Sequence, residues 1–95
     1  MKADYDIEFE GKRYKKEEFI YRPWEEPSNK RMKYCSAFYN LWVRERARTT
    51  GKGLEKMSSH NLWTKKFVPF FNRLYKARKN KKEPITWNDF KDLPP

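Results

Sequence analysis

Hydrophobic and polar residues alternate strictly near the start of the chain, in the segment DYDIEFE at residues 4–10. A spacing of two is typical of a strand with one buried and one solvated face. The hydrophobic positions are Tyr5, Ile7 and Phe9. The turn-forming residues around Gly11, with Tyr14 behind them, predict a return strand and therefore a β-hairpin. Residues 15–21 form too short a pattern to distinguish a short helix from a continued hairpin.

Helical spacing replaces this alternation after residues 22–30, where two prolines predict a connector. In residues 31–48, hydrophobic side chains recur every three or four positions and fill an arc about 100° wide. They are Tyr34, Phe38, Leu41 and Trp42. Tyr39 and Val43 lie outside this arc, so we expect them to face outward. The helix is expected to end just before Gly51, which would cap it.

A second hydrophobic stripe at helical spacing covers residues 58–79, with Ser58 or Ser59 as the expected N-cap. Its members are Trp63, Phe67, Phe70, Phe71, Leu74 and Ala77. Pro69 lies in the middle, where a proline removes a backbone hydrogen bond and bends a helix. Because the stripe keeps its phase across this proline, we favour one kinked helix. Two helices that break before Pro69 are the alternative.

The C-terminal segment begins with a charged stretch, residues 77–84, which we expect to form a loop. The sequence TWND at residues 86–89 resembles a capping box with Asp in place of Glu and predicts a short last helix. Trp87 and Phe90 would share the inner face of that helix.

Together these elements predict one small domain over residues 1–95, in the α+β class and mostly α. It has a β-hairpin region (1–21), a connector (22–30) and a basic helical region (31–95). The hairpin is expected to pack on two long aromatic-lined helices, with a short C-terminal helix closing the core. Few aliphatic residues and a net charge of +10 would normally indicate disorder, but 7 Phe, 6 Tyr and 4 Trp provide enough buried area for a thin core.

The charge is concentrated in the middle of the chain. Residues 28–83 hold 16 basic and 3 acidic side chains, whereas residues 1–27 hold 6 basic and 8 acidic ones. A segment this basic repels itself unless a polyanion lies nearby, and nucleic acid is the commonest such partner. An acidic protein or lipid surface is one alternative. A solvated surface that only keeps the protein soluble is another.

We expect phosphate contacts from Lys and Arg on the outer faces of the two helices and in the segments beside them. The candidates are Lys30, Arg31, Lys33, Arg44, Arg48, Lys52, Lys65, Lys66, Arg73, Lys76, Arg78, Lys79, Lys81 and Lys82. Tyr39 is the candidate for base stacking, because it lies outside the hydrophobic stripe of its helix. The aromatic residues within the stripes are expected to form the core instead.

Several classes of protein are excluded by what the sequence lacks. It contains no run of about 20 apolar residues, no secretory signal and no Arg-rich transit peptide. The lone cysteine, Cys35, is expected to pack as a small hydrophobe and fits a reducing compartment, the cytoplasm or nucleus, with an organelle matrix as the alternative. One His and one Cys cannot supply a four-ligand zinc site, and no catalytic constellation or phosphate-binding glycine loop occurs. We therefore expect no enzymatic activity and no cofactor.

Two segments resemble known DNA-binding families. The sequence SAFYNLWVRERAR at residues 36–48 resembles the first helix of an HMG box. Residues 38–90 resemble the winged-helix domain that ends phage and poxvirus-type primase–helicases, through FYNLW, Gly51, SSHNLWTKKF, the following basic segment and Trp87. That second resemblance implies a helix near DNA that carries Ser59, Asn61, Lys65 and Lys66, with Arg78 to Lys82 on a wing. The long gap from Trp42 to Gly51 and the position of Pro69 depart from the family pattern.

The sequence thus predicts a small, non-catalytic nucleic-acid-binding domain, with DNA favoured over RNA. The alternatives are a structural or regulatory subunit of a large assembly, such as a ribosomal or organellar complex, and a small viral protein that binds a host protein. Sequence preference and oligomeric state do not follow from any of these patterns.

Overall fold

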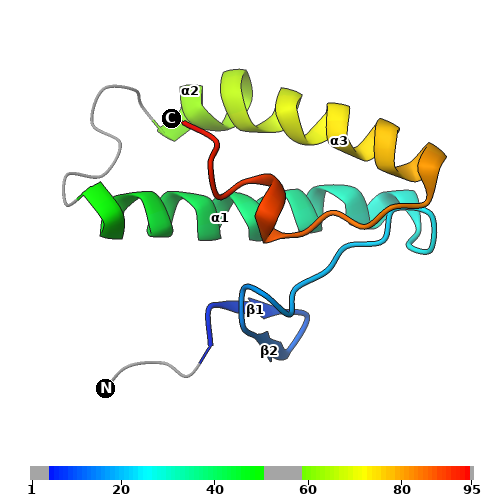
Figure 1. Ribbon diagram of the computed structural model, residues 1–95, viewed down its shortest axis with the longest axis horizontal. Coiled ribbons are helices and arrows are strands. Elements are labelled where there is room, and N and C mark those ends of the chain that lie inside the picture. The colour runs from blue at the N-terminus through cyan, green and yellow to red at the C-terminus, as the bar shows by residue number, and fades with distance from the viewer. Residues whose placement is uncertain (1–4, 51–58, 95) are drawn as a thin grey trace.

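Helix α1 (Arg31–Thr50) is the middle of three layers in the computed structural model, which describes residues 5–50 and 59–94. A second helical stretch, ending in α3 (Val68–Lys81), runs antiparallel along one side of α1, and the β-hairpin lies on the opposite side (Figure 1). The predicted α+β, mostly α architecture is confirmed. The hairpin contacts α1, whereas α3 lies beyond α1 from it.

The hairpin consists of β1 (Ile7–Phe9) and β2 (Lys12–Tyr14), which pair antiparallel with Phe9 opposite Lys12. The two residues between the strands, Glu10 and Gly11, have φ angles of 50° and 82°. Two positive φ angles give the tight turn whose twist matches the strands, and glycine supplies one of them without strain. The alternating burial of β1 confirms the predicted strand and its inner face.

Residues 15–21 form neither of the two expected elements. A turn follows β2, and Tyr21 then pairs with Ile85 in an isolated antiparallel bridge. The Tyr21 N–H donates to the Ile85 oxygen at 3.0 Å, and the Ile85 N–H donates to the Tyr21 oxygen at 2.8 Å. This bridge ties the segment after the hairpin to the C-terminal segment. The connector then ends in a short 3-10 turn, η1 (Ser28–Lys30), which leads into α1.

The second helical stretch is continuous, as favoured from the sequence. It comprises α2 (Ser59–Asn61), the π-helical segment η2 (Leu62–Phe67) and α3, and Pro69 occupies the first turn of α3. Leu62 and Phe67, five residues apart, are both buried, which is the spacing of a π-turn. Leu62 is not part of the hydrophobic stripe predicted from the sequence. Ala77, which the prediction placed in that stripe, is exposed.

The charged stretch at 77–84 is a loop only from Lys82 onward, so the prediction of a loop from residue 77 is wrong. Helix α3 continues to Lys81 and ends at Lys82, whose left-handed conformation (φ 56°, ψ 46°) takes the place of a capping glycine. The Glu83 N–H donates back to the Arg78 oxygen at 3.0 Å. The last helix is a single 3-10 turn, η3 (Trp87–Asp89), and its capping box is confirmed.

Aromatic rings dominate the core between α1, α3 and the C-terminal segment. Phe90 lies near its centre, with ring centroids 4.8 Å from Phe38 and 5.1 Å from Phe67. The Trp42 indole N–H donates to the Leu93 oxygen at 2.9 Å and thereby holds the end of the chain against α1. Cys35 is fully buried, as expected of a small hydrophobe. Burial raises the pKa of its thiol to about 12.

The expectation that Tyr39 and Val43 face outward is wrong, because both pack against the core. The ring of Tyr39 meets Trp63 and Phe67 edge-on, at centroid distances of 5.0 and 5.3 Å. The helical stretch of residues 59–81 covers this flank of α1 as well as the predicted arc.

Candidate nucleic-acid interface

The cations of the candidate set fall into two groups: those that another part of the chain already holds, and those without such a contact. The second group comes from the helical stretch of residues 59–81 and its cap. Its members are Lys65, Lys66, Arg73, Lys76, Lys81 and Lys82. Within the described residues, none of these six has an acidic partner or a side-chain hydrogen bond. All are exposed except Lys66, which is half-buried. We call these six residues the open cation set.

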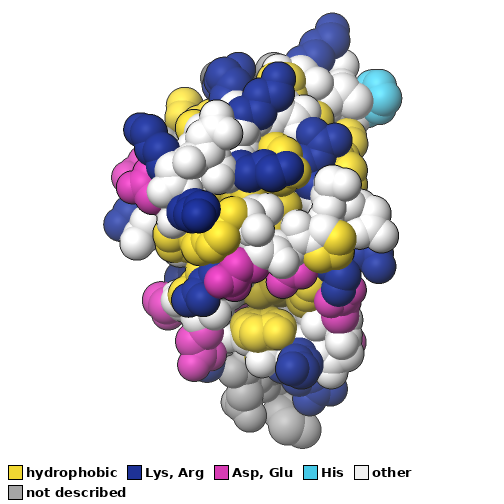
Figure 2. Space-filling view, turned by 90° about the vertical axis from the view of Figure 1, so that its right-hand side faces the viewer, with side chains coloured by type: hydrophobic (Ala, Val, Ile, Leu, Met, Phe, Trp, Pro, Cys, Tyr) yellow, Lys and Arg dark blue, Asp and Glu magenta, His cyan; other side chains and the backbone are white. Residues whose placement is uncertain are grey.

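The open cation set extends along most of one helix axis. At about 1.5 Å of rise per residue, the stretch from Lys65 to Lys82 spans roughly 20–25 Å. Phosphates of one strand recur at intervals far shorter than this, so several of them could contact the set at once. Figure 2 shows Lys and Arg gathered on the upper part of one face, while Asp and Glu lie mainly lower on it. On this face, most of the cations and most of the carboxylates therefore lie in different regions.

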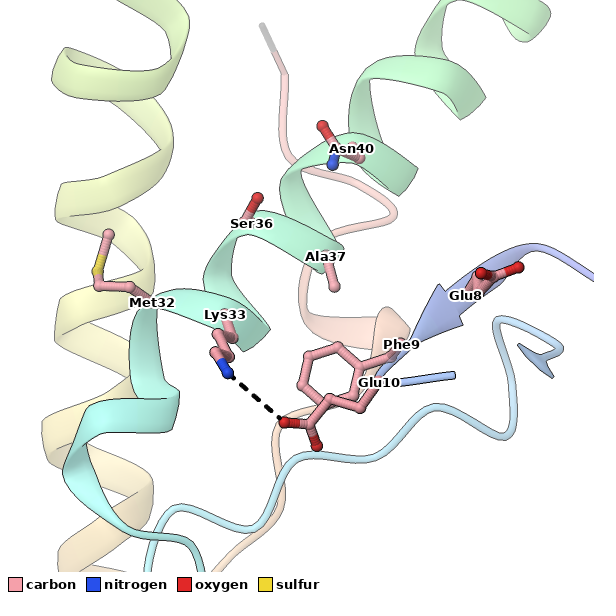
Figure 3. Close-up of a pocket in the computed structure, with 8 residues that line it drawn as sticks. All are labelled: Glu8, Phe9, Glu10, Met32, Lys33, Ser36, Ala37 and Asn40. Atoms are coloured by element: carbon pink, nitrogen blue, oxygen red, sulfur yellow. Dashed lines mark ion pairs between the residues drawn. The ribbon is translucent and has the colours of Figure 1, made fainter. Parts of the chain in front are cut away.

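Lys30 and Lys33, at the start of α1, are held by the turn of the hairpin. The Glu10 carboxylate accepts hydrogen bonds from Lys30 Nζ at 2.8 and 2.9 Å and lies 3.8 Å from Lys33 Nζ. Figure 3 shows this carboxylate facing Lys33 across a groove between β1 and α1. The hydrogen bond from Lys30 is the main cause that lowers the pKa of Glu10, and the same contact raises the pKa of Lys30. Both amines therefore already face a carboxylate within the chain.

Two arginines farther along α1 also have partners within the chain. Arg44 donates to the backbone oxygen of Asp6, in the segment before β1. Arg48 Nη2 lies 2.7 Å from Glu45 Oε1, one turn earlier on the same helix. Both guanidinium groups remain exposed, but each contact reduces what the arginine can offer to a phosphate. Lys52 lies outside the described residues.

Arg78 has a structural role at the end of α3. Its guanidinium forms a bidentate ion pair with the Asp89 carboxylate, at 2.6 and 3.2 Å, and donates to the Pro84 backbone oxygen at 2.7 Å. The Asp89 carboxylate also accepts from the Thr86 N–H at 3.0 Å. Bidentate pairs of this kind hold both side chains in place. The segment from Arg78 to Lys82, which the winged-helix resemblance places on a wing, forms the last turn of α3 and its cap.

Arg31 and Lys79 both lie over the ring of Tyr75. The Arg31 Cζ atom is 5.3 Å from the ring centroid, and the Lys79 Nζ atom is 5.5 Å from it. The Arg31 Nη1 atom also donates to the Asn72 Oδ1 atom at 2.9 Å. Neither cation pairs with a carboxylate in the described part of the chain, so no acidic side chain there neutralises their charges. Tyr75 is not among the residues predicted from the sequence, although its spacing of four from Lys79 on a helix is a signal of this contact.

No group of His, Cys, Asp and Glu side chains that could hold a metal ion occurs in residues 5–50 and 59–94. In the same part of the chain, no helix is both long and apolar enough to cross a membrane.

Comparison of the chain with models of protein families, with curated proteins and with solved structures gave no match.

Proposed function

We propose that this chain is a non-catalytic nucleic-acid-binding domain whose main phosphate contacts come from the open cation set. The observation that supports this proposal is the distribution of acidic partners. Cations near the hairpin and at the end of α3 are held by Glu10, Glu45 and Asp89, whereas the open cation set has no such partners among the described residues.

Unpaired cations in such number are costly unless an anion approaches them, because like charges on one helix repel each other. A phosphate backbone would relieve this repulsion and release its own counterions. The two resemblances stated above favour DNA over RNA. The cations that are already paired, above all Arg78, would contribute less to binding than the sequence analysis expected.

A salt titration with matched variants tests the proposal. Lys76 on α3 and Lys12 on β2 are both exposed lysines without an acidic partner among the described residues, but they lie in opposite layers. Lys76→Gln should weaken binding to short DNA and reduce the slope of log affinity against log salt by about 1. Lys12→Gln removes the same charge and should leave that slope unchanged.

Equal effects of the two substitutions would show that net charge, not the α3 layer, governs binding. A wild-type affinity that does not change with salt would overturn the proposal. Together with the lack of a cooperative thermal transition, that result would favour a subunit that folds on a protein partner.

A further inference from the structure

Three tyrosine rings form a nearly parallel stack that runs from the core to the surface beside the open cation set. Tyr21 and Tyr34 have centroids 4.1 Å apart with planes 17° from parallel. Tyr21 and Tyr75 lie 6.4 Å apart at 15°. Tyr21 is fully buried and Tyr34 is buried, whereas Tyr75 is only half-buried. The stack therefore ends in a ring that solvent reaches.

The two cations over this last ring are held in different ways. Arg31 comes from the first turn of α1 and is fixed by its hydrogen bond to Asn72, so its position over Tyr75 is preorganised. Lys79 comes from the next turn of α3, is exposed, and contacts the Tyr75 hydroxyl at 3.4 Å. A long, exposed lysine side chain can move away from the ring at little cost, because its charge keeps its hydration wherever it lies.

An aromatic ring beside two cations without carboxylate partners matches the chemistry of a nucleotide. A base of any identity offers a flat face to the ring, and Arg and Lys bind the phosphate attached to it. Bases inside a duplex are already stacked on their neighbours and do not offer this face. We propose that Tyr75, Arg31 and Lys79 form a stacking site for an unpaired nucleobase, with Arg31 and Lys79 on the adjoining phosphate.

This inference rests on the proposed function and narrows it to nucleic acid with unpaired bases. On binding, Lys79 would leave the ring for the phosphate and the base would take its place over Tyr75. The exposed Lys76 lies next to Tyr75 in α3, so the phosphates on either side of the stacked base would continue along the open cation set. The site differs from the Tyr39 site expected from the sequence, where the ring packs against two others.

The test compares an oligothymidylate with an abasic strand of the same length, which keeps the phosphates and removes the bases. Wild-type protein should bind the oligothymidylate about tenfold more tightly than the abasic strand, the size expected for a single base–aromatic stack. Tyr75→Leu should abolish most of this preference and leave the affinity for the abasic strand unchanged. Tyr75→Phe keeps the ring and should keep the preference.

The hairpin provides a matched control. Tyr5 is also a half-buried tyrosine with a cation over its ring, since the Arg13 Cζ atom lies 4.9 Å from the centroid. It lies in the layer opposite α3, so Tyr5→Leu should leave the preference intact. Circular dichroism of each variant checks that the fold is retained. Binding of the wild-type protein to the two strands tests the stacking site without any substitution.

Equal wild-type affinity for both strands, with a steep dependence on salt, would overturn the stacking site and leave the proposed function standing. A Tyr75→Leu protein that loses affinity for both strands equally would also overturn it, because the ring would then only support the cations. Tighter binding of a duplex than of the single strand would also overturn the stacking site. Binding to neither strand nor duplex would overturn the proposed function itself.

Discussion

Replacing Tyr21 by phenylalanine removes one buried hydroxyl group that has no hydrogen-bond partner among the described residues. A buried polar group that is left unsatisfied costs about 1–3 kcal/mol, because it loses its bonds to water and gains none. The Tyr21 ring itself, stacked on Tyr34, stays in place in the variant. After allowing for the small gap that the missing oxygen leaves, we expect the free energy of unfolding to rise by about 1 kcal/mol.

Tyr34→Phe is the matched control, because it makes the same chemical change at a hydroxyl that has a partner. The Tyr34 hydroxyl donates to Glu26 Oε1 at 3.3 Å. Its loss should lower the free energy of unfolding by about 1 kcal/mol. In a domain of this size, each change corresponds to a shift in Tm of roughly 4–8 °C, and the two shifts should have opposite signs.

The assay is thermal and urea unfolding, followed by circular dichroism and tryptophan fluorescence. Burial raises the pKa of Tyr21, so the folded state resists ionisation of this phenol, and the free energy of unfolding falls as the pH rises above about 10. Tyr21→Phe should therefore lose less stability in alkaline solution than the wild type does. If Tyr21→Phe lowers Tm as much as Tyr34→Phe, the hydroxyl is hydrogen-bonded in solution and the reasoning fails.

Three further substitutions have expected outcomes in unfolding experiments. Asp89→Ala removes the partner of Arg78 and should lower the free energy of unfolding by about 2 kcal/mol in a urea titration; an unchanged midpoint would contradict the role given to this pair. Tyr39→Ala should cost about 2 kcal/mol of stability, because its ring packs in the core; a variant with wild-type Tm would show that the ring is dispensable. Glu10→Gln should lower Tm at neutral pH, and the difference from the wild type should shrink as the pH falls and the carboxylate takes up a proton. This follows because its contact with Lys30 lowers the pKa of Glu10, so the stabilisation is complete above the ordinary carboxylate pKa and is lost as the pH falls through the lowered one.

Local patterns were sufficient to predict the elements that depend on neighbouring residues. The β-hairpin follows from a spacing of two and a glycine in the turn, and both features act within a few residues. The helix at Arg31–Thr50 follows from its hydrophobic arc. The capping box of Thr86 and Asp89 also joins residues three apart. Each of these predictions is confirmed because its physical cause lies within the segment itself.

Features that depend on contacts between distant residues could not be predicted in this way. The end of α3 at Lys81 has no glycine to mark it and is held by Arg78, whose partner Asp89 lies eleven residues later. Glu10 reaches Lys30 across twenty residues, so the charge pattern alone could not show which cations are already paired. Tyr39 was expected to face outward because a single-helix pattern does not show how much of that helix a second one covers.

The π-helical segment η2 lies between α2 and α3, and it determines how the helical stretch of residues 59–81 responds to the deletion of a residue. A π-turn contains one residue more than an α-turn, and one residue corresponds to about 100° of rotation around an α-helix. Deleting one residue from η2, for example the exposed Thr64, would turn it into ordinary α-helix. Because the wider turn absorbs the extra residue, α2 and α3 would keep their orientation relative to each other after the deletion. A single-residue deletion, which disrupts most core helices, could therefore be accommodated here, and relatives of this chain could differ in length at this point without a change of fold.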